Sequence, residues 1–527
     1  MVMIRLLEGK LRGNIKDEIL SGLTVAIALV PEAIAFAIIA GVDPKIGLFS
    51  AFLMGIITSV LGGRPGMITG ATGAIAVVVA PLIADHGVEY LFPAIILGGL
   101  LQIGVGALKL GKFIRMIPHP VMLGFVNGLA IVIFMSQFSQ FTTRTGGPLE
   151  GMELVIFGGL IAVTMLIMYF LPKITKAVPS PLVGIVVATL LAMFFFQDTI
   201  RIGDKADMST MSEGLFAPFF LLFPDTVPIS LGTLAILFPY ALKVAGVGLI
   251  ESLLTLTLID EMTDTRGNGN KESIAQGIGN FVTGFFGGMG GCAMIGQSMI
   301  NINSGARRRI SSFTAAVFLL SFMLVLGQFI AVIPIAGLVG VMFMVAIGTF
   351  EWSSFRVWNK VPKMDIFIIL VVSIVTVLED LAVAVLIGVI LSALSFSWEN
   401  ALRIRARKRT DEHGVKHYEI FGPLFFASTT TFMSKFDPKN DPESVIIDFA
   451  ESRVMDQSAI EAINKIAEKY EQEGKTIHLY HLSKDCVRLV KRAEKICRVN
   501  VLEDPDYFVA INDYKEAAAA RRQKALA

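Results

Sequence analysis

Two glycine-rich stretches decide the fold of this chain: GGRPGMITGATGAIAVVVA at 62–80 and GGMGGCAMIGQSMINI at 287–302. Each follows an apolar segment that carries a glutamate, Glu32 in the first case and Glu251 in the second. A carboxylate at membrane depth costs roughly 2.5–3.5 kcal/mol on insertion scales, so it marks a candidate functional site. Paired broken helices in the two halves of a membrane protein indicate the central site of a transporter.

The composition is that of a polytopic membrane protein. Of the 527 residues, 54% are hydrophobic and only 17% are charged. The formal net charge of +1 gives no field that would recruit nucleic acid, so we expect no such partner. Because no P-loop, Ser-His-Asp pattern or metal-ligand spacing stands out, we expect a protein that is not an enzyme and needs no cofactor. The cysteines are expected to be free thiols: Cys292, Cys486 and Cys497.

Fourteen apolar runs between 19 and 398 are candidate membrane segments. An even number returns the C-terminus to its starting side, and the basic residues before the first run place that side in the cytoplasm. We therefore expect a multi-pass protein of the cell's inner (plasma) membrane with both termini cytoplasmic. The segments are 19–41, 45–62, 67–84, 89–108, 118–138, 152–171, 178–196, 231–259, 273–287, 290–302, 311–333, 334–350, 365–379 and 381–398.

After Trp398 the composition becomes polar and basic, and a soluble α/β pattern follows. SVIIDFA and KTIHLYHL read as strands, and SAIEAINKIAEKYEQEG and CVRLVKRAEKI as helices. We expect five regions: a cytoplasmic N-terminus at 1–18, a transmembrane domain at 19–398, a basic linker at 399–414, an α/β domain at 415–515 and a tail at 516–527.

When the two glycine-rich breaks are aligned with each other, the membrane segments fall into two comparable halves. In each half an acidic span precedes a second span, a Gly-Gly pair, a short apolar run and a glycine beside small and hydroxyl residues. Seven spans in each half give the second half the opposite orientation. We therefore predict a polytopic helical membrane protein with a seven-plus-seven inverted repeat.

The half-helix starts, near 70–73 and 295–298, are the candidate anion site. A helix that begins within the membrane offers free N–H groups and the positive end of its dipole. Small-residue packing between helices would also place glycine and alanine here. Phe36, which follows Pro31, is a candidate lid, with a core position as the alternative. The other candidates are Thr69, Gly70, Ala71, Thr72, Ala293, Met294, Ile295, Gly296, Gln297 and Ser298.

The two glutamates are candidate coupling residues, because an ionised carboxylate would repel an anionic substrate. Either residue could take up a proton. Alternatively, Glu251 could hold Na⁺ together with Thr255, which lies four residues further along the same helix face. Glu32 could instead sit at a boundary or pair with another helix.

Four stretches together resemble the SulP family of anion transporters, and the C-terminal part resembles its STAS domain. The resemblance covers nearly the whole chain. It implies core and gate domains, a homodimer and elevator-type alternating access. The stretches are GLTVAIALVPEAIAFAIIAGVDPKIGLFSAF, ITGATGAIAVVVA, GLIESLLTLTLIDEMTDTRGNGNKESIAQGIGN and GGCAMIGQSMINI.

The resemblance also assigns roles by position. Glu251 and Thr255 match the cation site of sodium-dependent bicarbonate members, but Met294 and Ile295 replace small or hydroxyl residues near that site. Glu32 stands where many members carry glutamine, which favours a proton or a different substrate. In the STAS domain, Gln457 takes the place of the phosphorylated serine, so we expect no phosphorylation switch there.

Our leading hypothesis is a secondary active transporter of a small inorganic anion, sulfate or bicarbonate, coupled to Na⁺ or H⁺. A C4-dicarboxylate symporter using the same site is the alternative within transport. A third hypothesis is an anion-responsive regulatory membrane protein that signals through the STAS domain, where a cytoplasmic regulator could bind.

Overall fold

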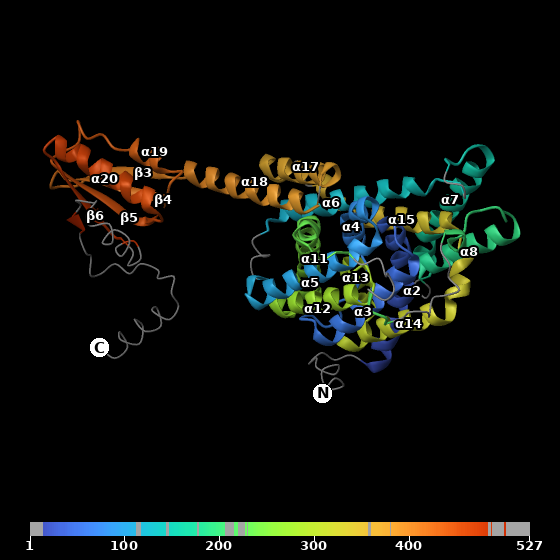
Figure 1. The fold of residues 1–527 in the computed structure, drawn as a ribbon. Coiled ribbons are helices and arrows are strands. Elements are labelled where there is room, and N and C mark those ends of the chain that lie inside the picture. Colours follow the sequence, from blue (N-terminus) through green and yellow to red (C-terminus); the bar gives the residue numbers. More distant parts are fainter. Residues whose placement is uncertain are drawn as a thin grey trace. The chain divides into compact units, whose positions relative to one another are not determined.

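The computed structural model of the chain has two units, Met1–Val389 and Ile390–Ala527, which we describe separately (Figure 1). The described residues are 14–111, 117–143, 147–175, 179–205, 216–219, 227–228, 230–356, 360–379, 381–482, 486 and 500–501.

Each of the fourteen predicted membrane segments coincides with a helix. In the described part of the chain, eight helices are long and apolar enough to cross a membrane, and three further apolar helices are shorter. The first set is α2 (Ile15–Ala40), α3 (Pro44–Leu61), α4 (Gly73–His86), α5 (Leu91–Ala107), α6 (His119–Ser136), α7 (Gly151–Ile174) and α8 (Ser180–Phe194). The second set is α11 (Leu231–Thr263), α12 (Gly269–Phe285), α13 (Ile295–Asn303), α14 (Arg309–Ala331), α15 (Ile335–Thr349), α17 (Lys363–Leu378) and α18 (Leu381–Leu402).

The first helix begins before its predicted start, because a charged residue there is buried. Helix α2 starts at Ile15, capped by the side chain of Asn14, and continues without a break through Pro31. Glu18 is fully buried, and its Oε1 accepts hydrogen bonds from the backbone N–H groups of Arg307 (2.7 Å) and Arg308 (2.9 Å). The carboxylate therefore stabilises the start of α14, where helix N–H groups lack partners.

Helices of the first set of seven pack on helices of the second set, and equivalent helices make equivalent contacts. Helix α2 packs on α14, and its counterpart α11 packs on α5. In the same way α3 packs on α14 and α12 on α5, while α6 packs on α17 and α15 on α7. Reciprocal packing of this kind is expected of two structural repeats related by a two-fold axis. Together with the antiparallel strands described below, it matches the predicted seven-plus-seven inverted repeat.

The membrane unit contains two groups of helices. Helices α2–α5 and α11–α14 surround the half-helix starts. Helices α6, α7, α8, α15 and α17 pack on one another, around a cluster of buried apolar side chains that includes Phe157, Ile161 and Val339. The first group corresponds to the expected core domain, and the second group corresponds to the expected gate domain.

The second unit contains a five-stranded sheet in the order β3-β4-β5-β6-β7. Strands β3 and β4 are antiparallel and the other neighbours are parallel. The strands are β3 (Arg405–Thr410), β4 (Lys416–Leu424), β5 (Ser444–Val454), β6 (Thr476–Tyr480) and β7 (Asn500–Val501), with helices α19 (Thr429–Met433) and α20 (Gln457–Gln472).

The expected basic linker at 399–414 is not a linker throughout. Helix α18 extends to Leu402, and Arg405–Thr410 forms strand β3 at the sheet edge. The predicted strands at SVIIDFA and KTIHLYHL and the helix at SAIEAINKIAEKYEQEG are confirmed as β5, β6 and α20. Except for Cys486, the helix predicted at CVRLVKRAEKI lies outside the described residues, as does the tail.

Candidate functional site

The two glycine-rich stretches meet in a two-stranded antiparallel pair. Strand β1 (Thr69–Gly70) pairs with β2 (Cys292–Ala293), with Thr69 opposite Ala293 and Gly70 opposite Cys292. The backbone N–H of Met294 also donates to the carbonyl oxygen of Ile68 (2.9 Å). Side chains at this crossing are buried almost completely.

A helix begins immediately after each strand. Helix α4 begins at Gly73, and its N-cap Thr72 accepts a hydrogen bond from the N–H of Ile75. Helix α13 begins at Ile295, and its N-cap Met294 makes no side-chain cap hydrogen bond. The short β pairing therefore brings two positive helix ends to one place, as the sequence predicted.

Glu251 reaches this crossing from helix α11. Its side chain is buried, and its Oε2 accepts a hydrogen bond from Cys292 Sγ (2.8 Å). The same sulfur lies 2.9 Å from Thr72 Oγ1, the N-cap of α4. The neighbouring Ser252 Oγ accepts from the N–H of Ala293 (3.0 Å). Glu251 is thus connected to the first half-helix through a thiol.

Thr255 lies one turn beyond Glu251 and is fully buried. Its hydroxyl donates to the backbone carbonyl oxygen of Glu251 (2.8 Å). That hydroxyl oxygen keeps a free lone pair, so it could contribute to a Na⁺ site with the Glu251 carboxylate. Within the described ranges, no group of three or more His, Cys, Asp or Glu side chains is arranged to hold a metal ion.

Glu32 reaches the other half-helix from α2. It is buried, and its Oε2 accepts a hydrogen bond from Nε2 of Gln297, in the first turn of α13. Phe36, one turn further along α2, lies against the start of α4: a Cβ added to Gly73 would stand 2.8 Å from Phe36 Cε1. The structure therefore brings Glu32, Phe36 and Gln297 to the predicted site.

The first turn of α13 also has open space beside it. Gly296 is exposed, and a Cβ added there would meet no heavy atom within 4 Å. Its neighbour Ser298 is instead fully buried, and its Oγ accepts from the N–H of Ile68 (2.9 Å). Gly296 thus faces an opening, whereas Ser298 holds the crossing together.

Three polar residues that the sequence analysis did not single out stabilise the crossing through hydrogen bonds: Gln102, Gln276 and Asn280. Nε2 of Gln276 donates to Thr69 Oγ1 (3.0 Å). Asn280 accepts from the N–H of Gly291 (2.8 Å) and donates both to its carbonyl oxygen (3.0 Å) and to Gln102 Oε1 (2.9 Å). The signal was present in the sequence: Glu272, Gln276 and Asn280 form a polar stripe at four-residue spacing along α12.

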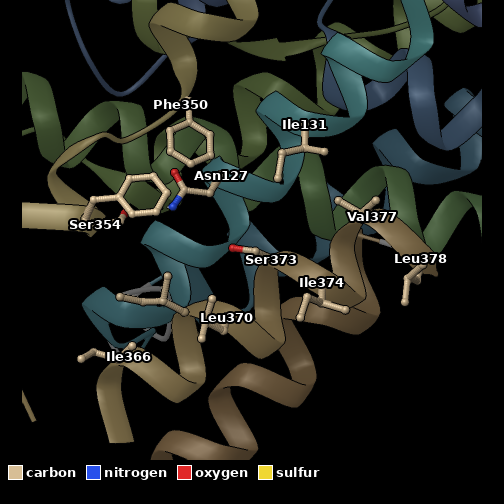
Figure 2. A pocket seen from close by; sticks show the side chains of 12 residues that line it. Asn127, Ile131, Phe350, Ser354, Ile366, Leu370, Ser373, Ile374, Val377 and Leu378 are labelled. Atoms are coloured by element: carbon tan, nitrogen blue, oxygen red, sulfur yellow. The ribbon is translucent and has the colours of Figure 1, made fainter. Parts of the chain in front are cut away.

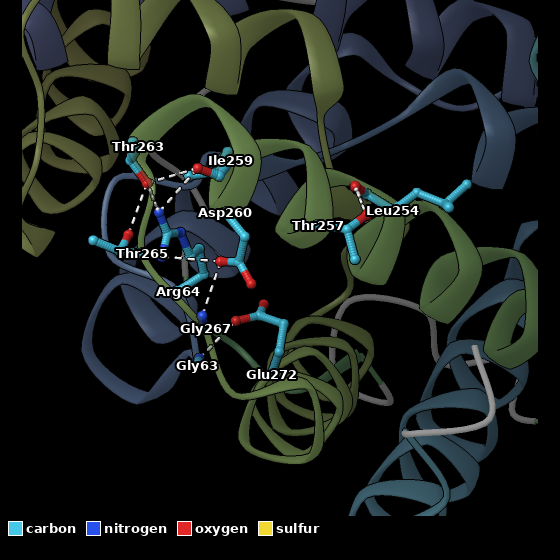
Figure 3. A network of polar contacts seen from close by, with 10 residues as sticks. All are labelled: Gly63, Arg64, Leu254, Thr257, Ile259, Asp260, Thr263, Thr265, Gly267 and Glu272. Carbon is cyan, nitrogen blue, oxygen red and sulfur yellow. Dashed lines mark hydrogen bonds and ion pairs between the residues drawn. The ribbon is translucent and has the colours of Figure 1, made fainter. Parts of the chain in front are cut away.

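A second polar network connects the loops at the ends of α3 and α11 (Figure 3). Arg64 forms an ion pair with Asp260 (3.0 Å), contacts Thr263, and donates to the carbonyl oxygen of Ile259 (3.1 Å). Glu272 Oε2 accepts from the N–H of the neighbouring Gly63 (2.6 Å). This network joins the two repeats beside the crossing. Gln276 links it to strand β1, because its Nε2 donates both to Glu272 Oε1 (2.8 Å) and to Thr69 Oγ1 (3.0 Å).

Broken helices that meet within a bundle of apolar helices, with a buried carboxylate beside each, define the class of polytopic membrane transporters. The model of the sulfate permease family matches residues 15–372, and that of the STAS domain matches 407–503. The chain belongs to the sulfate permease family of anion transporters.

Several relatives match nearly the full chain. The putative sulfate transporter YbaR of Bacillus subtilis is 46% identical, with 91% of this chain and 97% of the relative covered. The bicarbonate transporter BicA of Picosynechococcus sp. is 29% identical, with 87% and 88% covered.

Two solved structures share the fold. The transmembrane domain of a cyanobacterium bicarbonate transporter BicA aligns with a TM-score of 0.60 at 29% identity, covering 72% of this chain and 98% of that one. The murine Slc26a9 anion transporter in the inward-facing state aligns with a TM-score of 0.78 at 19% identity, covering 98% and 94%. This second likeness concerns the fold alone.

Proposed function

We propose that this protein is a secondary active transporter of a small inorganic anion, sulfate or bicarbonate, coupled to Na⁺ or H⁺. The observation that carries the proposal is the meeting of the α4 and α13 N-termini at the β1–β2 crossing, with a buried carboxylate beside each. The names of the relatives support sulfate and bicarbonate as the first substrates to test.

In this proposal the anion binds to the helix N-termini. Uncapped N–H groups at the start of α13 would donate to its oxygens, and both helix dipoles would stabilise its charge. The opening beside Gly296 supports access to that position. Glycine at this point lets the ligand approach the backbone closely.

The carboxylates provide the coupling. The side-chain donors to Glu251 and Glu32 are a thiol and an amide, both neutral groups. An anion bound nearby would therefore face uncompensated negative charge unless a cation or a proton arrives with it. Proton uptake by either residue, or Na⁺ held by Glu251 and Thr255, would provide that compensation.

The further parts of the proposal are elevator-type movement of the core group against the gate group, and assembly as a homodimer. We also propose the cell's inner (plasma) membrane as the location, with both termini in the cytoplasm. The fourteen apolar runs of the sequence and the basic residues before α2 support this orientation.

Uptake by the purified protein in liposomes tests the proposal. Radiolabelled sulfate, bicarbonate and succinate would each be offered with and without a Na⁺ gradient and with and without a pH gradient. We expect gradient-dependent uptake of sulfate or bicarbonate. Uptake of succinate alone would identify a dicarboxylate symporter instead, and anion binding without flux under every gradient would overturn the transport proposal.

A further inference from the structure

An apolar pocket of about 440 Å³ lies on the membrane unit, away from the half-helix crossing (Figure 2). We call it the α6–α17 pocket, because those helices form two of its walls. Its volume is within the range of about 300–1,000 Å³ that is usual for small-molecule sites. The lining residues on α17 include Ile366, Leu370, Ile374 and Val377, which follow one face of the helix.

The polar groups of the pocket are already paired within the protein. Asn127 donates to Ser354 Oγ (2.9 Å) and accepts from the N–H of Glu351 (2.8 Å). Ser373 donates to the carbonyl oxygen of Gly124 (3.0 Å). The surface that remains available to a ligand is apolar. An apolar ligand therefore fits, whereas a polar ligand would lose its hydration without gaining hydrogen bonds in return.

Helices α6 and α17 pack closely against each other beside the pocket. A Cβ added to Gly124 would stand 2.7 Å from Val372 Cβ, and one added to Gly128 would stand 2.4 Å from Thr376 Cβ. Helices α6 and α17 therefore touch at these glycines. Beside this contact, Leu370 and Ile374 remain 41% and 53% exposed.

Basic residues lie next to one end of the pocket. Lys363 stands one turn before Ile366 on the same face of α17 and is exposed, as are Arg356 and Lys360 in the preceding segment. The acidic residues of this segment are Glu351 and Asp365, so the three cations leave it with a positive balance.

Aromatic rings lie at the same end. Phe350, Trp352 and Phe355 form a cluster with ring centroids 5.0–6.2 Å apart. Trp352 is exposed, and its indole N–H donates to the carbonyl oxygen of Ile347 (2.9 Å). Aromatic rings beside basic residues at a helix end are typical of the level where a protein meets lipid headgroups.

We propose that the α6–α17 pocket binds one acyl chain of an anionic phospholipid, whose phosphate is held by Arg356, Lys360 and Lys363. Charge complementarity selects the headgroup, and the apolar walls between membrane helices select the chain. A second copy of this protein covering the same face is the competing occupant. The site is separate from the half-helix crossing and does not rest on the proposed transport function.

Native mass spectrometry of the full-length protein tests the proposal. The protein would be equilibrated with equal amounts of phosphatidylglycerol and phosphatidylcholine in detergent micelles. We expect preferential retention of phosphatidylglycerol by the wild type. Each basic residue should contribute about fivefold to binding. The combined R356Q/K360Q/K363Q variant should therefore lower the preference about a hundredfold. The control variant K109Q/K173Q, whose exposed lysines lie in the turn after α5 and on α7, should retain it.

A second variant fills the pocket. Ile374→Trp should reduce retention of both lipids, whereas Leu166→Trp, on an exposed position of α7, should not. Light scattering on the same samples reports the oligomeric state. Unchanged phosphatidylglycerol retention in the triple variant and in Ile374→Trp would overturn the proposal. So would loss of self-association in Ile374→Trp with lipid retention unaltered, because a second copy would then be the occupant.

Discussion

At the scale of single residues, the two carboxylates differ in how they reach the half-helices. Glu32 bonds directly to the first turn of α13 through Gln297, whereas Glu251 is joined to the N-cap of α4 through Cys292. The thiol is the only side chain among the described contacts that touches both Glu251 and Thr72. We therefore expect a change in the charge of Glu251 to affect the start of α4 through this sulfur.

Replacing Cys292 tests this link. Cys292→Ser keeps a hydrogen-bond donor between Glu251 and Thr72, and we expect coupled uptake to persist. Cys292→Ala removes the donor and leaves a buried carboxylate without it, which costs about 1–3 kcal/mol. We expect the Ala variant to alter the dependence of uptake on the Na⁺ or pH gradient, measured in liposomes. Equal gradient dependence in the wild type and both variants would contradict this role.

At the scale of elements, the crossing depends on two backbones approaching more closely than side chains allow. A Cβ added to Gly291 would stand 2.0 Å from the carbonyl oxygen of Gly70, directly beside the paired strands. Gly296, five residues later, has open space instead. The two glycines form a matched pair for a stability test.

We expect Gly291→Ala to destabilise the protein by at least about 2 kcal/mol, because the clash is with backbone that cannot rotate away. Gly296→Ala should be close to neutral. Thermal unfolding of the purified proteins in the same detergent measures both. Equal melting temperatures for the two variants would mean that the close approach at the crossing does not matter for stability.

In the second unit, Asp441 is the centre of a buried polar cluster. It accepts hydrogen bonds from Lys416, Tyr418 and Tyr470. Burial raises its pKa, but these three donors outweigh burial and hold the pKa below its usual value. The stabilisation is therefore fully present above the unfolded pKa of about 3.9, and it is lost as pH falls from there through the lower pKa of the folded state.

Asp441→Ala removes the acceptor that these three donors share, and we expect a loss of about 3 kcal/mol. Hydrogen exchange of the β4 and α20 amides in the full-length protein measures it. Asp437→Ala, at an exposed neighbour, should leave exchange unchanged. Protection in Asp441→Ala equal to that of the wild type at pH 7 would refute the role of the cluster.

The sequence predicted those elements whose buried residues leave an apolar pattern, and it missed elements that lack such a pattern. Long apolar runs and glycine breaks predicted the helices and the half-helix starts. Strand β3 was missed because five of its six residues are exposed, so RARKRT lacks the alternation that marks a strand. The start of α2 was missed because Glu18 looks like a surface residue, although its partners lie 289 and 290 positions away. Two-residue strands such as β1 and β2 carry no sequence pattern at all.

At the scale of the whole molecule, reciprocal packing of the two sets of seven helices places both broken helices and both carboxylates at one crossing. Neither repeat forms the site alone, since Glu251 and Cys292 come from the second and Thr72 from the first. We propose that this crossing binds an anion and that Glu251 couples the movement of the anion to a cation.

Radiolabelled anion uptake into liposomes by the wild type and the Glu251→Gln variant measures this coupling. The amide keeps the size of the side chain but can neither take up a proton nor attract Na⁺ as a carboxylate does. We predict gradient-driven uptake by the wild type and loss of either uptake or its gradient dependence in Glu251→Gln. Uptake by the variant with the same rate and the same Na⁺ or pH dependence as the wild type would show that Glu251 does not couple transport.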